Sequence, residues 1–77
     1  MPERITFDSS VIAALTYNAD ETLLDVELTS GRIYRYWMVS SAAYEAFAQA
    51  PSPGQHFNSE IRDRFPFREL ESIPRAV

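Results

Sequence analysis

The 77-residue sequence has no cysteine and no lysine, only two glycines and a single histidine. Without cysteine, neither a disulfide framework nor a thiolate metal site can form, and one histidine is too few for structural zinc. A glycine-rich phosphate loop is equally excluded, because the only glycines are Gly31 and Gly54. We therefore expect no metal, no cofactor and no catalytic residues, and we interpret the protein as a non-enzyme.

Long apolar runs are missing as well. The opening MPERITFDSS lacks the apolar segment of a signal peptide, and no stretch approaches the roughly 20 apolar residues of a membrane span. We expect a cytoplasmic protein with no membrane partner. The length predicts one domain, residues 1–77, with a core at about 8–70 and a frayed tail at 72–77. The net charge of −4 opposes non-specific attraction to nucleic acid.

Three segments, 11–17, 22–28 and 32–39, have the composition of strands and are separated by polar turn formers. The second hairpin could form in either of two registers. A two-residue loop would place Val26 opposite Arg35, whereas the three-residue loop Thr29-Ser30-Gly31 places Asp25 opposite Arg35 and Val26 opposite Tyr34. Opposite charges pair in the second register, and glycine suits the last position of a three-residue loop. The sequence therefore predicts the three-residue loop.

This register divides the predicted sheet into two faces. One face is apolar and is expected to be buried, provided that the first strand pairs Tyr17 with Thr22; it comprises Val11, Ala13, Leu15, Tyr17, Leu24, Val26, Leu28, Tyr34, Tyr36 and Met38. The other face mixes charges with isolated large apolar residues; it comprises Ile12, Ala14, Thr16, Leu23, Asp25, Glu27, Ile33, Arg35 and Trp37. The first face should carry the core.

Two helices should cover that apolar face. Ser40 or Ser41 can cap an alanine-rich helix that ends before Pro51. Ser52, followed by proline and a capping-box glutamine, begins a second helix that runs to about Phe65. The predicted fold class is α+β, a three-stranded antiparallel meander followed by two helices packed on one face, in the order β-β-β-α-α.

With these elements placed, residues 8–65 resemble the KTSC domain, a small domain found at the C-terminus of some lysyl-tRNA synthetases and as a stand-alone bacterial protein. Its central Tyr-x-Tyr motif is matched by Tyr34-Arg35-Tyr36, with Gly31 three positions before it. Further matches are Ser9-Ser10, Tyr17-Asn18, Leu24-x-Val26-x-Leu28, Val39, Tyr44, Ala50, Ser52, Gly54, Phe57-Asn58 and Ile61-Arg62. Leu28, Asn18 and Ser40 depart from the usual residues. The resemblance implies a domain of uncertain role that is suspected of binding nucleic acid, and it brings no catalytic residues; we interpret the protein as a small, non-catalytic binding module.

The paired tyrosines Tyr34 and Tyr36 have two interpretations. Exposed rings on a sheet can stack on single-stranded bases, whereas core rings keep their bodies buried and their hydroxyls at the rim. Because both share a face with Leu24 and Val26, we predict a mainly structural role for the pair.

The opposite face is the predicted binding surface. Arg35 is surrounded there by Trp37, Ile33 and Leu23. An apolar patch with a charged rim is suited to binding a dimer partner or a ligand. The N-terminal arm or the segment 65–67 could instead cover this face, and both alternatives stay open. We add Arg62 as a candidate phosphate contact. The partner is RNA or another nucleic acid, as the resemblance implies, or else a protein partner or a second copy, which the acidic charge favours.

Two further patterns have weaker functional interpretations. Arg62, Arg64 and Arg68, together with Arg32 and Arg35, could form a basic stripe, but Arg62 and Arg64 diverge by about 200° around a helix, which favours scattered surface arginines. His56 and Glu60 have the i, i+4 spacing of two metal ligands. Since no third ligand accompanies them, we interpret them as a polar helix face.

Overall fold

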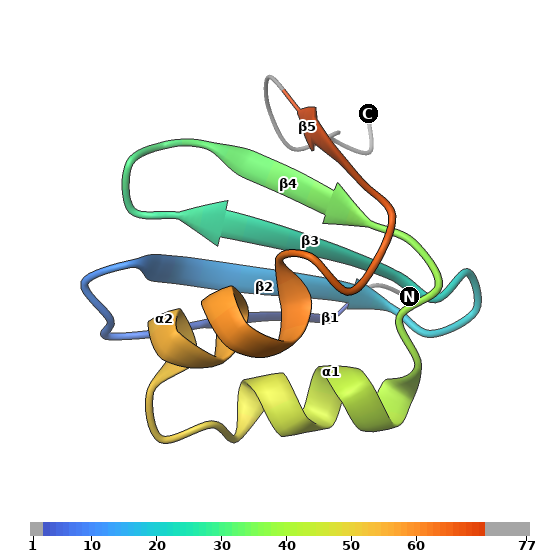
Figure 1. Cartoon of the computed structure of the whole chain (residues 1–77), viewed down its shortest axis with the longest axis horizontal. Helices are drawn as coiled ribbons and strands as arrows, with labels where there is room; N and C mark the ends of the chain where they lie inside the picture. Colours follow the sequence, from blue (N-terminus) through green and yellow to red (C-terminus); the bar gives the residue numbers. More distant parts are fainter. Residues whose placement is uncertain (1–2, 71–77) are drawn as a thin grey trace.

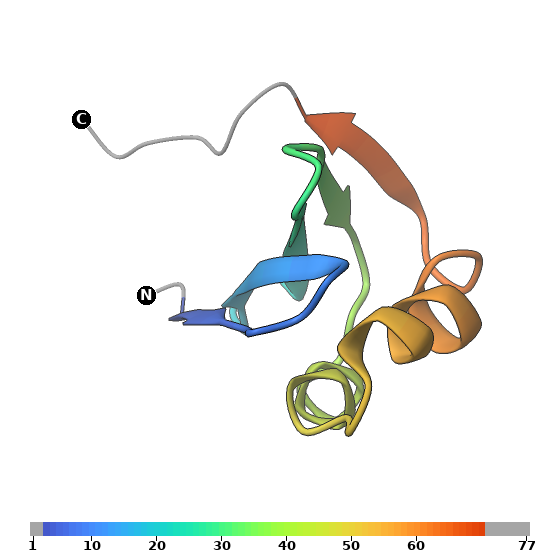
Figure 2. The same cartoon turned by 90° about the vertical axis from the view of Figure 1, so that its left-hand side faces the viewer.

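The computed structural model describes residues 3–70, so the frayed tail expected at 72–77 lies outside the described residues. The chain forms a single five-stranded antiparallel sheet in the order β1-β2-β3-β4-β5. Its elements are β1 (Glu3–Thr6), β2 (Ile12–Asn18), β3 (Leu23–Leu28), β4 (Ile33–Tyr36), α1 (Ser41–Ala48), α2 (Pro53–His56), the π-helical turn η1 (Phe57–Ile61) and β5 (Phe67–Leu70). Both helices lie on one side of the sheet (Figures 1 and 2). None of the described helices is long and apolar enough to cross a membrane.

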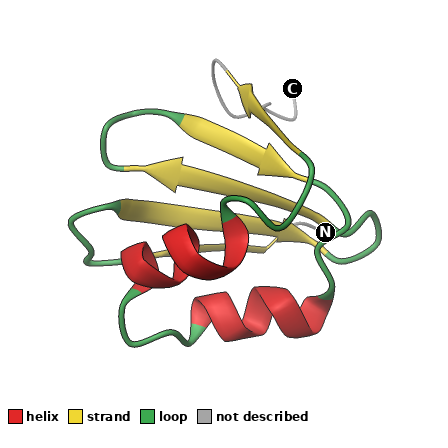
Figure 3. Ribbon diagram, viewed as in Figure 1, coloured by secondary structure: helices red, strands yellow, loops and turns green. Residues whose placement is uncertain are grey.

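The α+β class is confirmed, but the prediction of three strands is wrong because two edge strands were missed. β1 pairs with β2 from Glu3↔Tyr17 to Thr6↔Ala14, and β5 pairs with β4 from Tyr36↔Phe67 to Ile33↔Leu70. Each edge strand has only four residues and carries charged side chains. Charged side chains suit sheet edges, which face water, but they hide the apolar alternation from sequence analysis. These two segments extend the sheet at its edges (Figure 3).

The predicted register of the second hairpin is confirmed. Val26 pairs with Tyr34, and Asp25 pairs with Arg35. The loop is closed by hydrogen bonds from the Leu28 N–H to the Arg32 carbonyl at 2.8 Å and from the Gly31 N–H to the Leu28 carbonyl at 3.0 Å. Gly31 has a φ of +98°, a backbone conformation that side chains disfavour. This position therefore requires glycine.

The register of the first hairpin differs from the prediction. Tyr17 pairs with Leu24 rather than with Thr22, which lies in the turn with a φ of 53°. A bulge between Ile12 and Ala14 inserts one extra residue into β2. Since a bulge reverses the alternation beyond it, Ile12 turns to the helix side and is fully buried. Its predicted place on the opposite face is wrong.

The core lies between the helices and the sheet, as expected. Its buried members are Ile12, Leu15, Tyr17, Leu24, Val26, Tyr36, Val39, Tyr44, Phe47, Phe57 and Ile61. Two residues predicted for this face are exposed instead, Met38 at 73% and Val11 at 39%. Met38 follows the end of β4 with a φ of 62°, so strand alternation no longer applies to it, and Val11 precedes β2.

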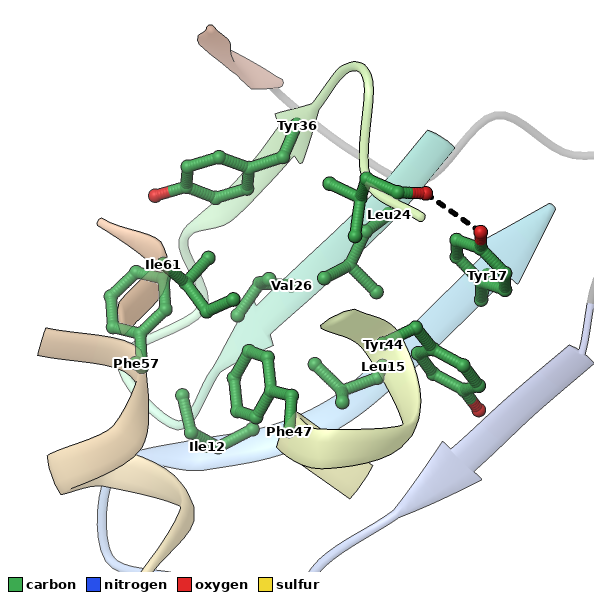
Figure 4. Close-up of a cluster of buried hydrophobic side chains, with 11 residues drawn as sticks. Ile12, Leu15, Tyr17, Leu24, Val26, Tyr36, Tyr44, Phe47, Phe57 and Ile61 are labelled. Atoms are coloured by element: carbon green, nitrogen blue, oxygen red, sulfur yellow. Dashed lines mark hydrogen bonds between the residues drawn. The ribbon is translucent and has the colours of Figure 1, made fainter. Parts of the chain in front are cut away.

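Aromatic contacts fix the helices on the sheet. The rings of Tyr17 on β2 and Tyr44 on α1 stack with centroids 4.4 Å apart, and Phe47 stacks on Phe57 at 6.2 Å. The Tyr17 hydroxyl donates a hydrogen bond of 2.7 Å to the Val39 carbonyl, drawn as a dashed line in Figure 4. These contacts tie α1 and the β4–α1 connection to β2, and they join α1 to η1.

The first helix begins as predicted, and the second ends earlier than predicted. The Ser40 hydroxyl accepts a hydrogen bond from the Ala43 N–H at 3.2 Å, which caps α1. Ser52 occupies the corresponding position before α2, but its side chain makes no capping hydrogen bond. The helix then widens into η1, where the Arg62 N–H donates to the Phe57 carbonyl at 2.8 Å. It ends at Ile61, short of the predicted Phe65.

Candidate functional site

A pocket of about 280 Å³ opens where β4 and β5 meet the π-helical turn η1. It is lined by aromatic and aliphatic side chains together with two arginines and an asparagine: Val11, Leu28, Arg32, Tyr34, Tyr36, Phe57, Asn58, Arg62 and Phe67. We call it the tyrosine pocket. Both tyrosines of the Tyr-x-Tyr motif line it, and so do Phe57, Asn58 and Arg62, which the sequence analysis also singled out.

Tyr36 forms the inner wall of the tyrosine pocket. Its ring lies between Phe57, edge-on at 6.0 Å, and Phe67 at 5.4 Å. The residue as a whole is only 1% exposed. Its hydroxyl nevertheless makes no hydrogen bond to any residue of the described chain, and in Figure 4 it points away from Leu24. Burial raises the pKa of Tyr36 to about 12, so the hydroxyl is a neutral donor at physiological pH.

Tyr34 and Arg32 form the outer wall of the tyrosine pocket. Tyr34 is half-buried, and its ring meets Phe67 edge-on at 5.9 Å. The exposed Arg32 guanidinium lies beside the Tyr34 hydroxyl and within the field of the Glu69 carboxylate; these two groups, in that order, raise the pKa of Arg32. This wall therefore offers a cation and a hydroxyl to solvent.

The π-helical turn supplies the third wall. Phe57 and Ile61 point into the core, while Asn58 and Arg62 stay exposed. A guanidinium nitrogen of Arg62 lies 3.5 Å from the Asn58 side-chain oxygen, at the limit of a hydrogen bond. Wide turns of this kind occur frequently at functional sites. Here the turn places an amide and a guanidinium at the same pocket that Tyr36 lines.

On the other sheet face, Arg4 and Arg35 are held by carboxylates, whereas Arg68, beside Arg35 in the sheet, has no ion pair within residues 3–70. We call that face, which is turned away from both helices, the helix-free face; its paired rows include Asp25 with Arg35 and Glu27 with Ile33. Arg35 donates to both carboxylate oxygens of Asp25 at 2.8 and 3.0 Å. Arg4 donates to Glu27 in the same way at 3.0 and 3.1 Å. Within residues 3–70 these are the only ion pairs, and neither involves Arg32 or Arg62.

The residues predicted to form the binding surface fall on two sides of the molecule. Leu23, Ile33 and Arg35 share the helix-free face, each partly exposed. Trp37 follows them and is half-buried, and its backbone N–H donates a hydrogen bond of 2.9 Å to the Pro66 carbonyl. Arg62 does not join this group, because it lies on η1 at the tyrosine pocket. None of the helices within residues 3–70 covers the helix-free face (Figure 2).

The remaining polar candidates lie elsewhere. His56, Glu60 and Arg64 line a separate hollow against α1, so Arg62 and Arg64 diverge around the helix. The His56 ring packs on Phe47 at 5.2 Å. The described residues contain no cluster of three or more side chains able to hold a metal ion.

Sequence reasoning missed how the tyrosine pocket is built. Phe67 lies beside Tyr36 only because β5 pairs with β4, and that pairing was not predicted. Arg32 and Asn58 were noted for other reasons, as one member of a basic group and as a motif match. The apolar start of β5 after Pro66 is a signal that could have indicated the extra strand.

Comparisons with known proteins agree with the resemblance found in the sequence. The sequence profile of the KTSC domain matches residues 8–65. A lysine–tRNA ligase of Nostoc punctiforme is 38% identical over 63 residues, which are 82% of this chain but 11% of the ligase. An uncharacterised protein of Stutzerimonas stutzeri is 38% identical over 60 residues, covering 78% of this chain and 84% of that protein. The crystal structure of a KTSC domain protein from Yersinia pestis matches with a TM-score of 0.83 and 28% identity, over 91% of this chain and 99% of that one.

Proposed function

The chain belongs to the KTSC domain family, and we propose that it works as a non-catalytic module that binds single-stranded RNA through the tyrosine pocket. One observation carries the proposal. Arg32 and Arg62, neither of which forms an ion pair within residues 3–70, converge on a concave surface walled by Tyr34 and Tyr36. Cations beside aromatic rings are the combination that single-stranded nucleic acids require. Similarity to lysine–tRNA ligases, which by name act on tRNA, supports an RNA partner.

The distribution of charge favours the tyrosine pocket over the helix-free face for phosphate. On the helix-free face, Arg35 and Arg4 are each held in two hydrogen bonds by a carboxylate. A phosphate would have to displace a bound carboxylate at either of these two arginines, which leaves Arg68 as the single arginine of that face without an ion pair within residues 3–70. At the tyrosine pocket, Arg32 and Arg62 are exposed and can turn toward a phosphate. The net charge of −4 is thus compatible with RNA binding at one local surface.

The test measures binding of a fluorescent single-stranded RNA of about ten nucleotides by anisotropy, over a range of salt concentrations. We expect binding to weaken steeply with salt, and Arg32→Ala or Arg62→Ala each to reduce affinity several-fold and lower the salt slope by about one. Arg64→Ala is the matched control, because it removes the same charge two residues further along the chain, at a separate hollow. Equal losses for Arg62→Ala and Arg64→Ala would contradict a site at the pocket.

A second candidate function is self-association through the helix-free face. It is favoured by Leu23, Ile33 and Trp37, which are partly exposed on a side that no helix covers. If this face pairs two copies, light scattering should find a dimer that Trp37→Asp converts to a monomer. A monomeric wild type at high concentration would eliminate this candidate.

A further inference from the structure

We propose that the tyrosine pocket receives one unstacked base of the RNA, and that the Tyr36 hydroxyl and the Asn58 amide read its polar edge. The inference rests on the proposed function, because it names the part of the RNA that the tyrosine pocket recognises. It adds a claim that phosphate binding alone does not make. The pocket should distinguish a nucleotide from a sugar phosphate.

The first argument is the state of the Tyr36 hydroxyl. Buried polar groups are almost always hydrogen-bonded, and Tyr17 follows that rule through its bond to Val39. Tyr36 as a residue is only 1% exposed, and its hydroxyl has no partner in the described chain. This hydroxyl is not a fully buried unpaired atom, since Thr16 Oγ1 is the only one within residues 3–70, so it meets the open space of the tyrosine pocket. It is therefore available to a ligand in the pocket.

The second argument is the shape and lining of the pocket. Its volume of about 280 Å³ lies just below the roughly 300–1,000 Å³ of pockets that hold drug-sized ligands. One base with its sugar suits such a space, and two stacked bases do not. Phe57, Phe67 and Tyr34 supply aromatic surface around it, against which a base can stack or pack edge-on.

The third argument is the chemistry at the rim. Asn58 carries both a donor and an acceptor on one planar amide, which matches the paired donors and acceptors on the edge of a base. Arg62 approaches only the oxygen of that amide, so the nitrogen stays available. The exposed guanidinium groups of Arg62 and Arg32 stand at the mouth, where the phosphates of a chain entering the pocket would pass.

The experiment titrates the protein with the four 5′-ribonucleoside monophosphates and with ribose 5-phosphate, and follows backbone amide resonances by NMR. We expect at least one nucleotide to bind about tenfold more tightly than ribose 5-phosphate, as one stacked and hydrogen-bonded base implies. The shifted resonances should belong to β4, β5 and η1. If ribose 5-phosphate binds as tightly as every nucleotide, the base subsite is overturned, while RNA binding at the arginines still stands.

Removing one tyrosine hydroxyl at a time separates recognition of the base from a general effect of losing a hydroxyl. Tyr36→Phe keeps the ring and should reduce nucleotide affinity about five- to tenfold, leaving ribose 5-phosphate affinity and the salt slope of RNA binding unchanged. Tyr44→Phe is the control, because its ring stacks on Tyr17 away from the tyrosine pocket. Asn58→Ala is a second variant that tests recognition of the base, and because Asn58 is exposed it leaves the core intact. Wild-type nucleotide affinity in both Tyr36→Phe and Asn58→Ala would overturn the inference.

Discussion

Arg35 holds the carboxylate of Asp25 with two hydrogen bonds, from Nε at 2.8 Å and from a terminal nitrogen at 3.0 Å. The Asp25 side chain is only 7% exposed and the Arg35 side chain 25% exposed, although both lie on the face that no helix covers. The guanidinium therefore shields a carboxylate that the strand would otherwise leave buried without a counter-ion. This pair joins β3 to β4 and makes their register specific.

Removing the cation of this pair should be costly. We expect Arg35→Ala to lower the free energy of unfolding by about 2–3 kcal/mol, because a buried carboxylate is left unpaired. Arg4→Ala is the matched control: its pair with Glu27 has side chains 53% and 16% exposed, and its loss should cost less than about 1 kcal/mol. Urea unfolding of both variants measures the difference. Equal losses of unfolding free energy in the two variants would mean that the burial of Asp25 does not strengthen its ion pair.

The same pair explains why this part of the fold could be predicted from the sequence. Two independent signals, the opposite charges of Asp25 and Arg35 and the glycine at position 31, indicate one hairpin register. A one-residue slip would bring Asp25 into the apolar core, so only one register is compatible with the burial pattern. Ser40 likewise marks the start of α1 by its local capping chemistry, which needs no tertiary information.

The tyrosine pocket could not be predicted, because it depends on contacts that local patterns do not encode. The bulge between Ile12 and Ala14, which turns Ile12 into the core, has no signature in the β2 sequence. β5 forms only because β4 offers it an edge, and its four residues are too few for a clear alternation. Phe67 reaches Tyr36 through that pairing. The match of Asn58 and Arg62 to the family motif indicated important positions without indicating what they face.

Two tyrosines of the core should respond differently to loss of their hydroxyls. Tyr17→Phe leaves the buried Val39 carbonyl without its 2.7 Å partner and should lower the free energy of unfolding by about 1–2 kcal/mol. Tyr36→Phe removes a hydroxyl that has no partner in the described chain, and should change stability by less than about 0.5 kcal/mol. Urea unfolding without ligand compares them. A large loss for Tyr36→Phe would reveal a structural role for its hydroxyl.

Gly54 allows α2 to approach the start of β2. A Cβ atom at this position would lie 3.0 Å from the Val11 Cβ and 3.1 Å from its Cγ2. We expect Gly54→Ala to cost about 1 kcal/mol, because the clash outweighs the better helix propensity of alanine. Val11→Ala should relieve part of that cost by shortening the opposing side chain. A double-mutant cycle in urea should find a coupling of at least about 0.5 kcal/mol, and strict additivity would rule out the contact.

Alkaline pH should destabilise the fold through Tyr36. Burial raises its pKa in the folded protein to about 12, whereas an unfolded chain has a tyrosine pKa of about 10. Below pH 10 both states keep the proton, so stability is full there; as pH rises from about 10 to about 12, only the folded state keeps it, and stability falls.

The measurement compares the free energy of unfolding of wild type and Tyr36→Phe across this interval. Burial also raises the pKa of Tyr17 and of Tyr44, so the variant should show a smaller fall rather than none. Absorbance of the phenolate should show, in parallel, that the variant lacks the group that titrates last. Identical pH profiles would mean that the Tyr36 hydroxyl is as well solvated in the folded protein as in the unfolded chain, which would contradict the pKa that burial gives it.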